Sequence, residues 1–179
     1  MQQSRLRLEH YNLMHLHLEP VLEAESAALG SYADFEKATL GSSIQFSPVE
    51  LPNGESRYSV DLTLTAGPRE GHSDFPYRLK IQLLGIFDGR DLPEEKREAL
   101  VAVNGASMLY GVAREVLLSL TSRSVGGPVM LPTVEFSQFG DSFLKNRQAE
   151  HPAREALPDK KEKATSASHP HPKKLKKDD

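Results

Sequence analysis

Alternation of apolar and polar residues is the strongest signal in the first half of the chain. Large apolar side chains occupy every second position in 58–64 and again in 75–83, with mostly polar residues between them. A two-residue period is typical of a strand that buries one side and exposes the other. Similar alternation in Leu6–Leu18, and at Ile44 and Phe46, predicts two more strands.

The predicted strands are connected by loops too short to hold crossover helices. Pro52-Asn53-Gly54 reads as a turn, and Gly67–Asp74 is a short Gly/Pro/acid-rich link. The segment Glu23–Gly41 has no clear period and is expected to be a loop with a short helical turn. Four strands joined in this way predict an antiparallel meander.

After Phe87 the period changes to that of a helix. Pro93 suits the first helical position, and the acids that follow it suit the positive end of the helix dipole. Asn104-Gly105 is expected to bend or break this helix. Its second half has an apolar stripe at spacings of three and four, formed by Leu109, Val112, Val116 and Leu120. Neighbouring apolar residues widen the stripe beyond what one sheet face covers, which predicts a second packing partner.

The rest of the chain divides into an ordered part and a tail. Val129–Phe136 is expected to be extended, with Pro132 limiting its ladder bonds, and 136–144 to form a short amphipathic final helix. Beyond Gln148 large apolar residues are scarce, so the tail cannot offset its ordering cost. The prediction is therefore an α+β domain over 1–148, with a four-stranded antiparallel sheet, a long C-terminal helix and a short final helix, followed by a disordered tail over 149–179.

Composition narrows the class of protein. A chain of 179 residues with 38% hydrophobic content supports one core. It has no cysteine, which excludes disulfides, thiolate metal sites and cysteine nucleophiles. The net charge is -3 despite a basic tail, and an acidic body disfavours nucleic acid as a partner. Neither an apolar run long enough for a membrane span nor a signal-peptide core is found, so a cytoplasmic location without membrane insertion is expected.

Catalytic and metal chemistry have little support. Gly71-His72-Ser73-Asp74 holds triad residue types, but neighbours in one loop rarely reach triad geometry. Nucleophile-elbow, phosphate-loop and zinc-protease motifs are missing, so neither an enzyme nor a cofactor is expected. His15 and His17 have the spacing of a two-histidine chelate, and Glu19 continues that side. A metal site needs three or four ligands, so a solvated strand face is the favoured interpretation.

Four segments, in matching order and spacing, resemble the SecB family of export chaperones. They are Gly85-Ile86-Phe87, the stretch 104–115 ending in Ala113-Arg114-Glu115, the stretch 119–123, and Leu131–Phe136. The resemblance extends over 6–144 and is strongest over 77–136. It implies a four-stranded antiparallel sheet and a long helix that packs between subunits of a tetramer, a dimer of dimers. The interface would then include the stripe Leu109, Val112, Val116 and Leu120.

The resemblance also implies an apolar groove for extended, unfolded client chains. A protein that only holds clients needs an exposed apolar surface that accepts side chains of many shapes, and it needs no nucleotide or other cofactor. The groove residues implied here are Ile44, Phe46, Phe87, Phe136, Phe139 and Phe143.

The implied docking site for the SecA motor differs from the family pattern. Export members present a leucine and an acid on the strand before Gly85, where this chain has Arg78 and Lys80, whereas Glu19 matches one family acid. Such a charge reversal would repel a basic partner. Three functions stay open: a holdase for protein export, a dedicated chaperone of an antitoxin in a toxin–antitoxin pair, and an adaptor that kept the fold without chaperone activity.

Overall fold

One sheet of four antiparallel strands and one long helix form the described part of the protein. The structure, a computed structural model, describes residues 5–21, 32–52, 55–70 and 75–137. The elements are β1 (Arg7–Pro20), η1 (Phe35–Lys37), β2 (Ala38–Glu50), β3 (Ser56–Pro68), β4 (Tyr77–Asp88), η2 (Glu94–Lys96) and α1 (Arg97–Thr121). The α+β class, with four strands and a C-terminal helix, is thus confirmed.

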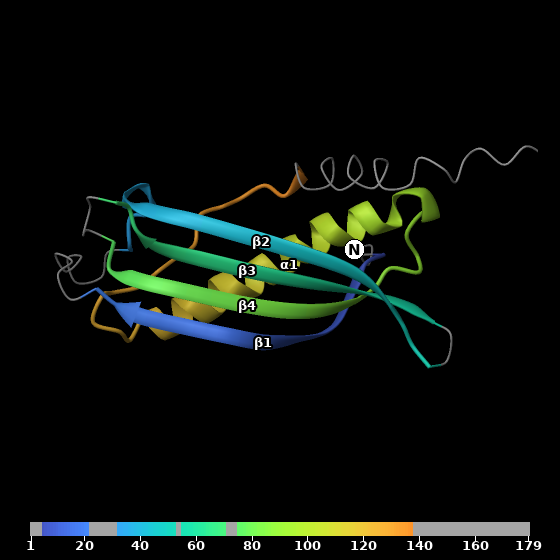
Figure 1. Cartoon of the computed structure of the whole chain (residues 1–179), viewed down its shortest axis with the longest axis horizontal. Coiled ribbons are helices and arrows are strands. Elements are labelled where there is room, and N and C mark those ends of the chain that lie inside the picture. Colours follow the sequence, from blue (N-terminus) through green and yellow to red (C-terminus); the bar gives the residue numbers. More distant parts are fainter. Residues whose placement is uncertain (1–4, 22–31, 53–54, 71–74, 138–179) are drawn as a thin grey trace, which may run out of the picture.

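The strand order is β1-β4-β3-β2, which differs from a simple meander. β2, β3 and β4 follow one another as predicted, but β1 pairs with β4 instead of β2 (Figure 1). The link between β1 and β2 is much longer than a hairpin turn, so these strands need not be neighbours. β1 and β2 are therefore the two edges of the sheet.

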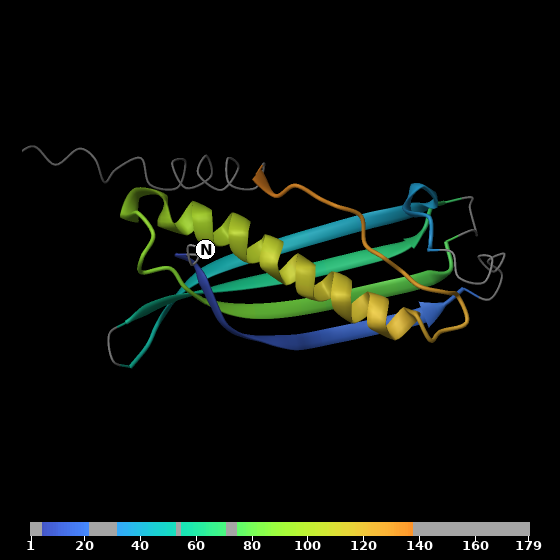
Figure 2. The ribbon, with the colours of Figure 1, turned by 180° about the vertical axis from the view of Figure 1, so that it is seen from behind.

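Helix α1 runs obliquely across one face of the sheet and closes the core there (Figure 2). The inward side chains of β3 and β4 are almost completely buried, among them Leu62, Leu64 and Leu83. They meet a buried helix stripe that includes Leu109 and Leu117. Full burial of each such side chain contributes about 1.5–3 kcal/mol, so this face supplies most of the apolar stabilisation.

Asn104-Gly105 does not break the helix, so the prediction of a break there is wrong. α1 is a single helix of 25 residues. Gly105 is buried against the sheet, where a Cβ atom would lie 3.0 Å from Val60 Cγ2 and 3.2 Å from the Phe87 ring. The glycine therefore allows the helix backbone to approach β3 and β4 closely.

After α1 the chain returns across the same face towards β2 without forming a strand (Figure 2). Gly127 has a φ of 78°, a conformation that favours glycine at this turn. The hydroxyl of Tyr77 donates to the Gly127 carbonyl at 2.8 Å, and the backbone N–H of Val129 donates to Thr121 Oγ1 at 2.8 Å. These bonds fix the start of an extended segment, residues 128–136, which contains the stretch Val129–Phe136 predicted to be extended.

Some predictions concern residues that the structure does not describe. The loop 71–74, most of the expected final helix and the tail 149–179 lie outside the described residues. Within the described ranges, α1 and the shorter helices are too short or too polar to cross a membrane.

Candidate functional site

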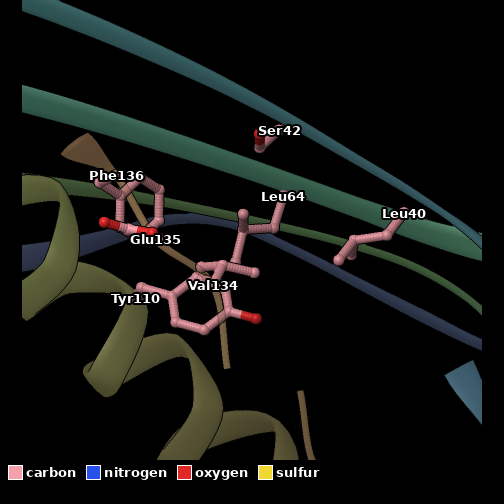
Figure 3. Close-up of a pocket in the computed structure, with 7 residues that line it drawn as sticks. All are labelled: Leu40, Ser42, Leu64, Tyr110, Val134, Glu135 and Phe136. Atoms are coloured by element: carbon pink, nitrogen blue, oxygen red, sulfur yellow. The ribbon is translucent and has the colours of Figure 1, made fainter. Parts of the chain in front are cut away.

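An apolar pocket opens where the extended segment 128–136 crosses the edge of the sheet. It has a volume of about 150 Å³. Its walls come from β2, β3, α1 and the extended segment, as Figure 3 shows. The lining residues are Leu40, Ser42, Leu64, Tyr110, Val134, Glu135 and Phe136. A single carboxylate, that of Glu135, breaks an otherwise uncharged lining.

Tyr110 and Phe136 make the back of this pocket. Their rings meet edge to face, with centroids 5.6 Å apart and planes at 66°. The Tyr110 hydroxyl donates a 2.6 Å hydrogen bond to the Pro132 carbonyl, and burial raises the pKa of that hydroxyl. The aromatic pair and this hydrogen bond hold the extended segment against α1, so the pocket is built before any ligand arrives.

Beside the pocket, a row of mostly apolar side chains runs along the same side of β2. In β2, Leu40, Ser42, Ile44 and Phe46 face the same side of the sheet as α1, because they pair with inward-facing residues of β3. Leu40 is 37% exposed, whereas Ile44 and Phe46 are half-buried. Phe46 stacks on Tyr58 with centroids 5.5 Å apart. We call this row and the pocket the β2 groove.

The backbone of β2 is also open to a further strand. β2 is an edge strand of the described sheet, and its register with β3 runs without a shift from Ala38 to Glu50. Residues 38–49 carry no charged side chain. β1, by contrast, has two register shifts and several ionisable side chains. Bulges, charges and prolines are the usual protections of an edge strand, and of these, residues 38–49 of β2 have only Pro48, so β2 is the less protected edge.

Of the six residues implied for the groove, three lie at the β2 groove, one lies in the core and two are outside the described residues. Phe136 lines the pocket, although its side chain is mostly buried, and Ile44 and Phe46 belong to the β2 row. Phe87 is fully buried in the subunit core and does not reach the groove surface. Phe139 and Phe143 lie outside the described residues. Six of the seven residues that line the pocket were not predicted: Leu40, Ser42, Leu64, Tyr110, Val134 and Glu135.

The residues implied for the oligomer interface differ in how exposed they are. Leu109 is fully buried, because it faces β4 in the subunit's own core near Gly85. Val112 and Val116 lie on the flank of that stripe and are half-buried, and Leu120 is 43% exposed. The buried stripe of α1 thus includes Ala106, Ala113 and Leu117 rather than the valines.

A second apolar surface lies on β1, on the side of the sheet that carries α1. Tyr11, Leu13 and Leu16 pair with inward-facing residues of β4, yet they are 46%, 46% and 36% exposed. α1 reaches β1 only towards its C-terminal end, which leaves the middle of this strand uncovered (Figure 2). Together with the flank of α1, these side chains form an apolar surface within the described chain.

The residues implied for partner docking lie on the opposite face. Glu19, Arg78 and Lys80 are exposed, and Glu19 pairs with Arg78 across β1 and β4. His17 Nε2 lies 3.5 Å from Glu19 Oε2. The described residues contain no group of three or more His, Asp or Glu side chains that could hold a metal ion.

Charged side chains form a network at the end of the sheet where β1 begins. The Arg57 side chain is only 7% exposed and forms ion pairs with Glu9 at 2.8 Å and Glu55 at 3.0 Å. Arg90 binds Asp88 at 2.9 Å. Its hydrogen bonds lower the pKa of Asp88 to about 2, although burial acts in the opposite direction. The network ties β1 to β3 and to the loop after β4.

The described residues thus form an α+β fold in which one four-stranded sheet carries one long helix beside an apolar pocket. The chain belongs to the SecB family: the family model described as "Preprotein translocase subunit SecB" matches residues 31–148. The resemblance noted in the sequence is thereby confirmed.

Individual relatives are distant. The chain is similar to the protein-export protein SecB of Acidithiobacillus ferrooxidans, with 30% identity over 114 residues, which cover 64% of this chain and 75% of the relative. The chain is also 31% identical to the SecB of Dechloromonas aromatica over 83 residues, which cover 46% of this chain and 54% of the relative.

Among solved structures, the chain is similar to the SecB-like chaperone Rv1957 of Mycobacterium tuberculosis, in complex with a ChAD peptide from the HigA1 antitoxin. The TM-score is 0.43 and the identity 19%, and the match covers 73% of this chain and 91% of the other.

Proposed function

We propose that this protein is a nucleotide-independent holdase chaperone that binds extended, non-native polypeptides in the β2 groove. The observation that carries this proposal is the groove itself: a pocket of about 150 Å³ with a nearly uncharged lining, next to the less protected edge strand of the described sheet. Membership of the SecB family supports the same role. The groove contains no convergent polar cluster of the kind that catalysis needs.

Client binding would combine two physical interactions. An extended chain laid along β2 can form main-chain hydrogen bonds with the strand, which do not depend on the client's sequence. Its alternate side chains would enter the apolar row that ends in the pocket between Leu40 and Phe136. Weak contacts of this type gain strength by repetition along a long client.

We further propose that the protein works as a homotetramer, a dimer of dimers. Tyr11, Leu13 and Leu16 on β1, with Leu120 on α1, expose apolar side chains outside the β2 groove. Large uncovered apolar surfaces are unusual on monomers and are typical of interfaces between subunits. Assembly through this surface leaves the β2 groove of each subunit open to a client.

The family and its protein-export relatives support a role before export, with client holding in the cytoplasm. Docking of SecA on the outer sheet face has less support in this chain. Arg78 and Lys80 are both exposed there, and like charges repel a basic docking segment. Client holding is therefore the part of the proposal on which the rest depends.

Groove substitutions test the proposal directly. Leu40→Glu and Val134→Glu each place a charge in the groove at a partly exposed side chain, whereas Val125→Glu adds the same charge at a side chain that is 79% exposed and does not line the pocket. Light scattering of a chemically unfolded client, without nucleotide, measures the suppression of aggregation. We expect the two groove variants to need about tenfold more protein for half suppression, and Val125→Glu to match the wild type. Equal suppression by all four proteins would refute the groove assignment.

A further inference from the structure

The face of the sheet opposite α1 is an open polar surface. Figure 1 views this face directly, and none of the described elements lies across it. Its central side chains are short and polar, such as Thr63 and Thr65 on β3 and Ser43 on β2. Leu84, Ile86 and Val49 add apolar area in the described part of this face, and all three are half-buried. The surface is therefore flat, hydrated and unlike the β2 groove on the other face.

One corner of this face gathers basic side chains from two neighbouring strands. Arg78 and Lys80 alternate with the buried Tyr77 and Leu79 of β4, so both project outward, and both are exposed. His17 pairs with Lys80 across the strands, and His15 pairs with Gln82 beside it. We call His15, His17, Arg78 and Lys80 the basic corner.

A β-bulge in β1 brings the two histidines into this corner. The register shifts by one residue between Leu13 and His15. Without that shift, His15 would continue the alternation of Leu13 and face α1. With it, Leu13 and Leu16 stay on the α1 side, whereas His15 and His17 face outward. Bulges commonly re-aim side chains in this way at functional surfaces.

The two permanent cations of the basic corner have no carboxylate partner in the described part of the chain. Glu19 faces Arg78 across the strands, but its carboxylate lies 3.5 Å from His17 Nε2, and Asp61 accepts a 2.8 Å hydrogen bond from Gln82. Other arginines of the sheet differ, since Arg57, for example, is held by two carboxylates. Arg78 and Lys80 are thus available for an external anion.

We propose that the basic corner docks an acidic segment of a partner protein. Arg78 and Lys80 supply the charge, and the imidazoles and the Thr65 hydroxyl supply hydrogen-bond donors to carboxylates. Two adjacent cations on one strand suit a few carboxylates, whereas duplex nucleic acid is held through many phosphate contacts. The chain's net charge of -3 further disfavours a long polyanion. This surface is separate from the β2 groove, so docking and client holding can occur together.

The experiment uses the full chain and a fluorescein-labelled peptide of alternating Glu and Ser, with a Gln/Ser peptide and a single-stranded DNA of similar length as comparisons. Fluorescence anisotropy measures binding to the wild type and to Arg78→Glu/Lys80→Glu. The matched control is Lys96→Glu/Arg123→Glu, which changes the net charge equally at exposed positions outside the sheet. Client aggregation assays on the same proteins report the β2 groove separately.

We expect the corner variant to bind the Glu/Ser peptide at least about tenfold more weakly than the wild type. The control variant should bind like the wild type, and added salt should weaken wild-type binding. Four results would each overturn the proposal: no binding of the Glu/Ser peptide, equal binding of the Gln/Ser peptide, equal loss in the control variant, or tighter binding of DNA. Because client holding is measured independently, its loss cannot be mistaken for loss of docking.

Discussion

Two glycines of α1 should respond in opposite ways to the same substitution. Gly111 is exposed, and a Cβ atom there would have no neighbour within 4 Å. Gly111→Ala therefore gains only the helix preference of alanine, which stabilises the folded state by about 1 kcal/mol. Gly105 is buried, and its Cβ would lie 3.0 Å from Val60 and 3.2 Å from Phe87.

Gly105→Ala has the same helix preference in its favour but must displace side chains that are themselves fully buried. Overpacking of a tight core costs about 1–3 kcal/mol, which outweighs the gain of about 1 kcal/mol. The expected net effect is a loss of up to about 2 kcal/mol. For a chain of this size, 1 kcal/mol corresponds to a change in Tm of about 2–4 °C.

Urea and thermal unfolding, followed by circular dichroism at one fixed protein concentration, measure both variants against the wild type. The fixed concentration is needed because assembly shifts apparent stability. Gly105→Ala should unfold at lower urea and Gly111→Ala at higher urea. If Gly105→Ala were the more stable of the two, the close contact between α1 and the sheet would not exist as described.

Three further substitutions test other parts of the fold. Asp88→Asn removes a carboxylate whose lowered pKa of about 2 stabilises the folded state above pH about 4, a contribution that disappears as the pH falls towards 2. The free energies of unfolding of wild type and variant should therefore differ by at most about 2 kcal/mol at neutral pH, and by less because solvent screens the half-exposed Arg90. The two values should converge near pH 2, and a difference that stays constant with pH in urea titrations would contradict this. Arg57→Ala breaks two ion pairs and should lower the urea midpoint, and an unchanged midpoint would show that the network contributes nothing to stability. Tyr110→Phe removes the hydrogen bond to Pro132 and should cost about 1 kcal/mol and speed proteolysis of the extended segment, whereas equal cleavage would argue against anchoring.

The strands were predictable because their side chains alternate. Tyr58–Leu64 and Tyr77–Leu83 each have one buried and one solvent-facing side, and they lie within β3 and β4. The order of the strands was not predictable from this pattern. Alternation shows which side of β1 is apolar, but it does not show which strand β1 pairs with. Because β1 pairs with β4, the edges of the sheet are β1 and β2, which differ in charge and regularity.

The helix shows why the groove and the interface were harder to predict. Spacings of three and four fit several overlapping stripes on α1, and the chosen stripe through Val112 and Val116 is rotated from the buried one through Ala106 and Ala113. Small residues carry little hydrophobic signal, although they allow closer packing than valine. Leu40 could have been predicted as a groove residue, because the alternation of Ile44 and Phe46 extends back to it. Tyr110 and Val134 meet only through the tertiary fold.

The central claim is that this protein captures non-native chains in an open groove while assembled with copies of itself. Multi-angle light scattering after size exclusion, with and without a chemically unfolded client and without nucleotide, tests this most directly. The account predicts a species of about four times the subunit mass of 19.9 kDa that co-elutes with the client. A monomer that leaves the client to aggregate would contradict both the assembly and the holdase function.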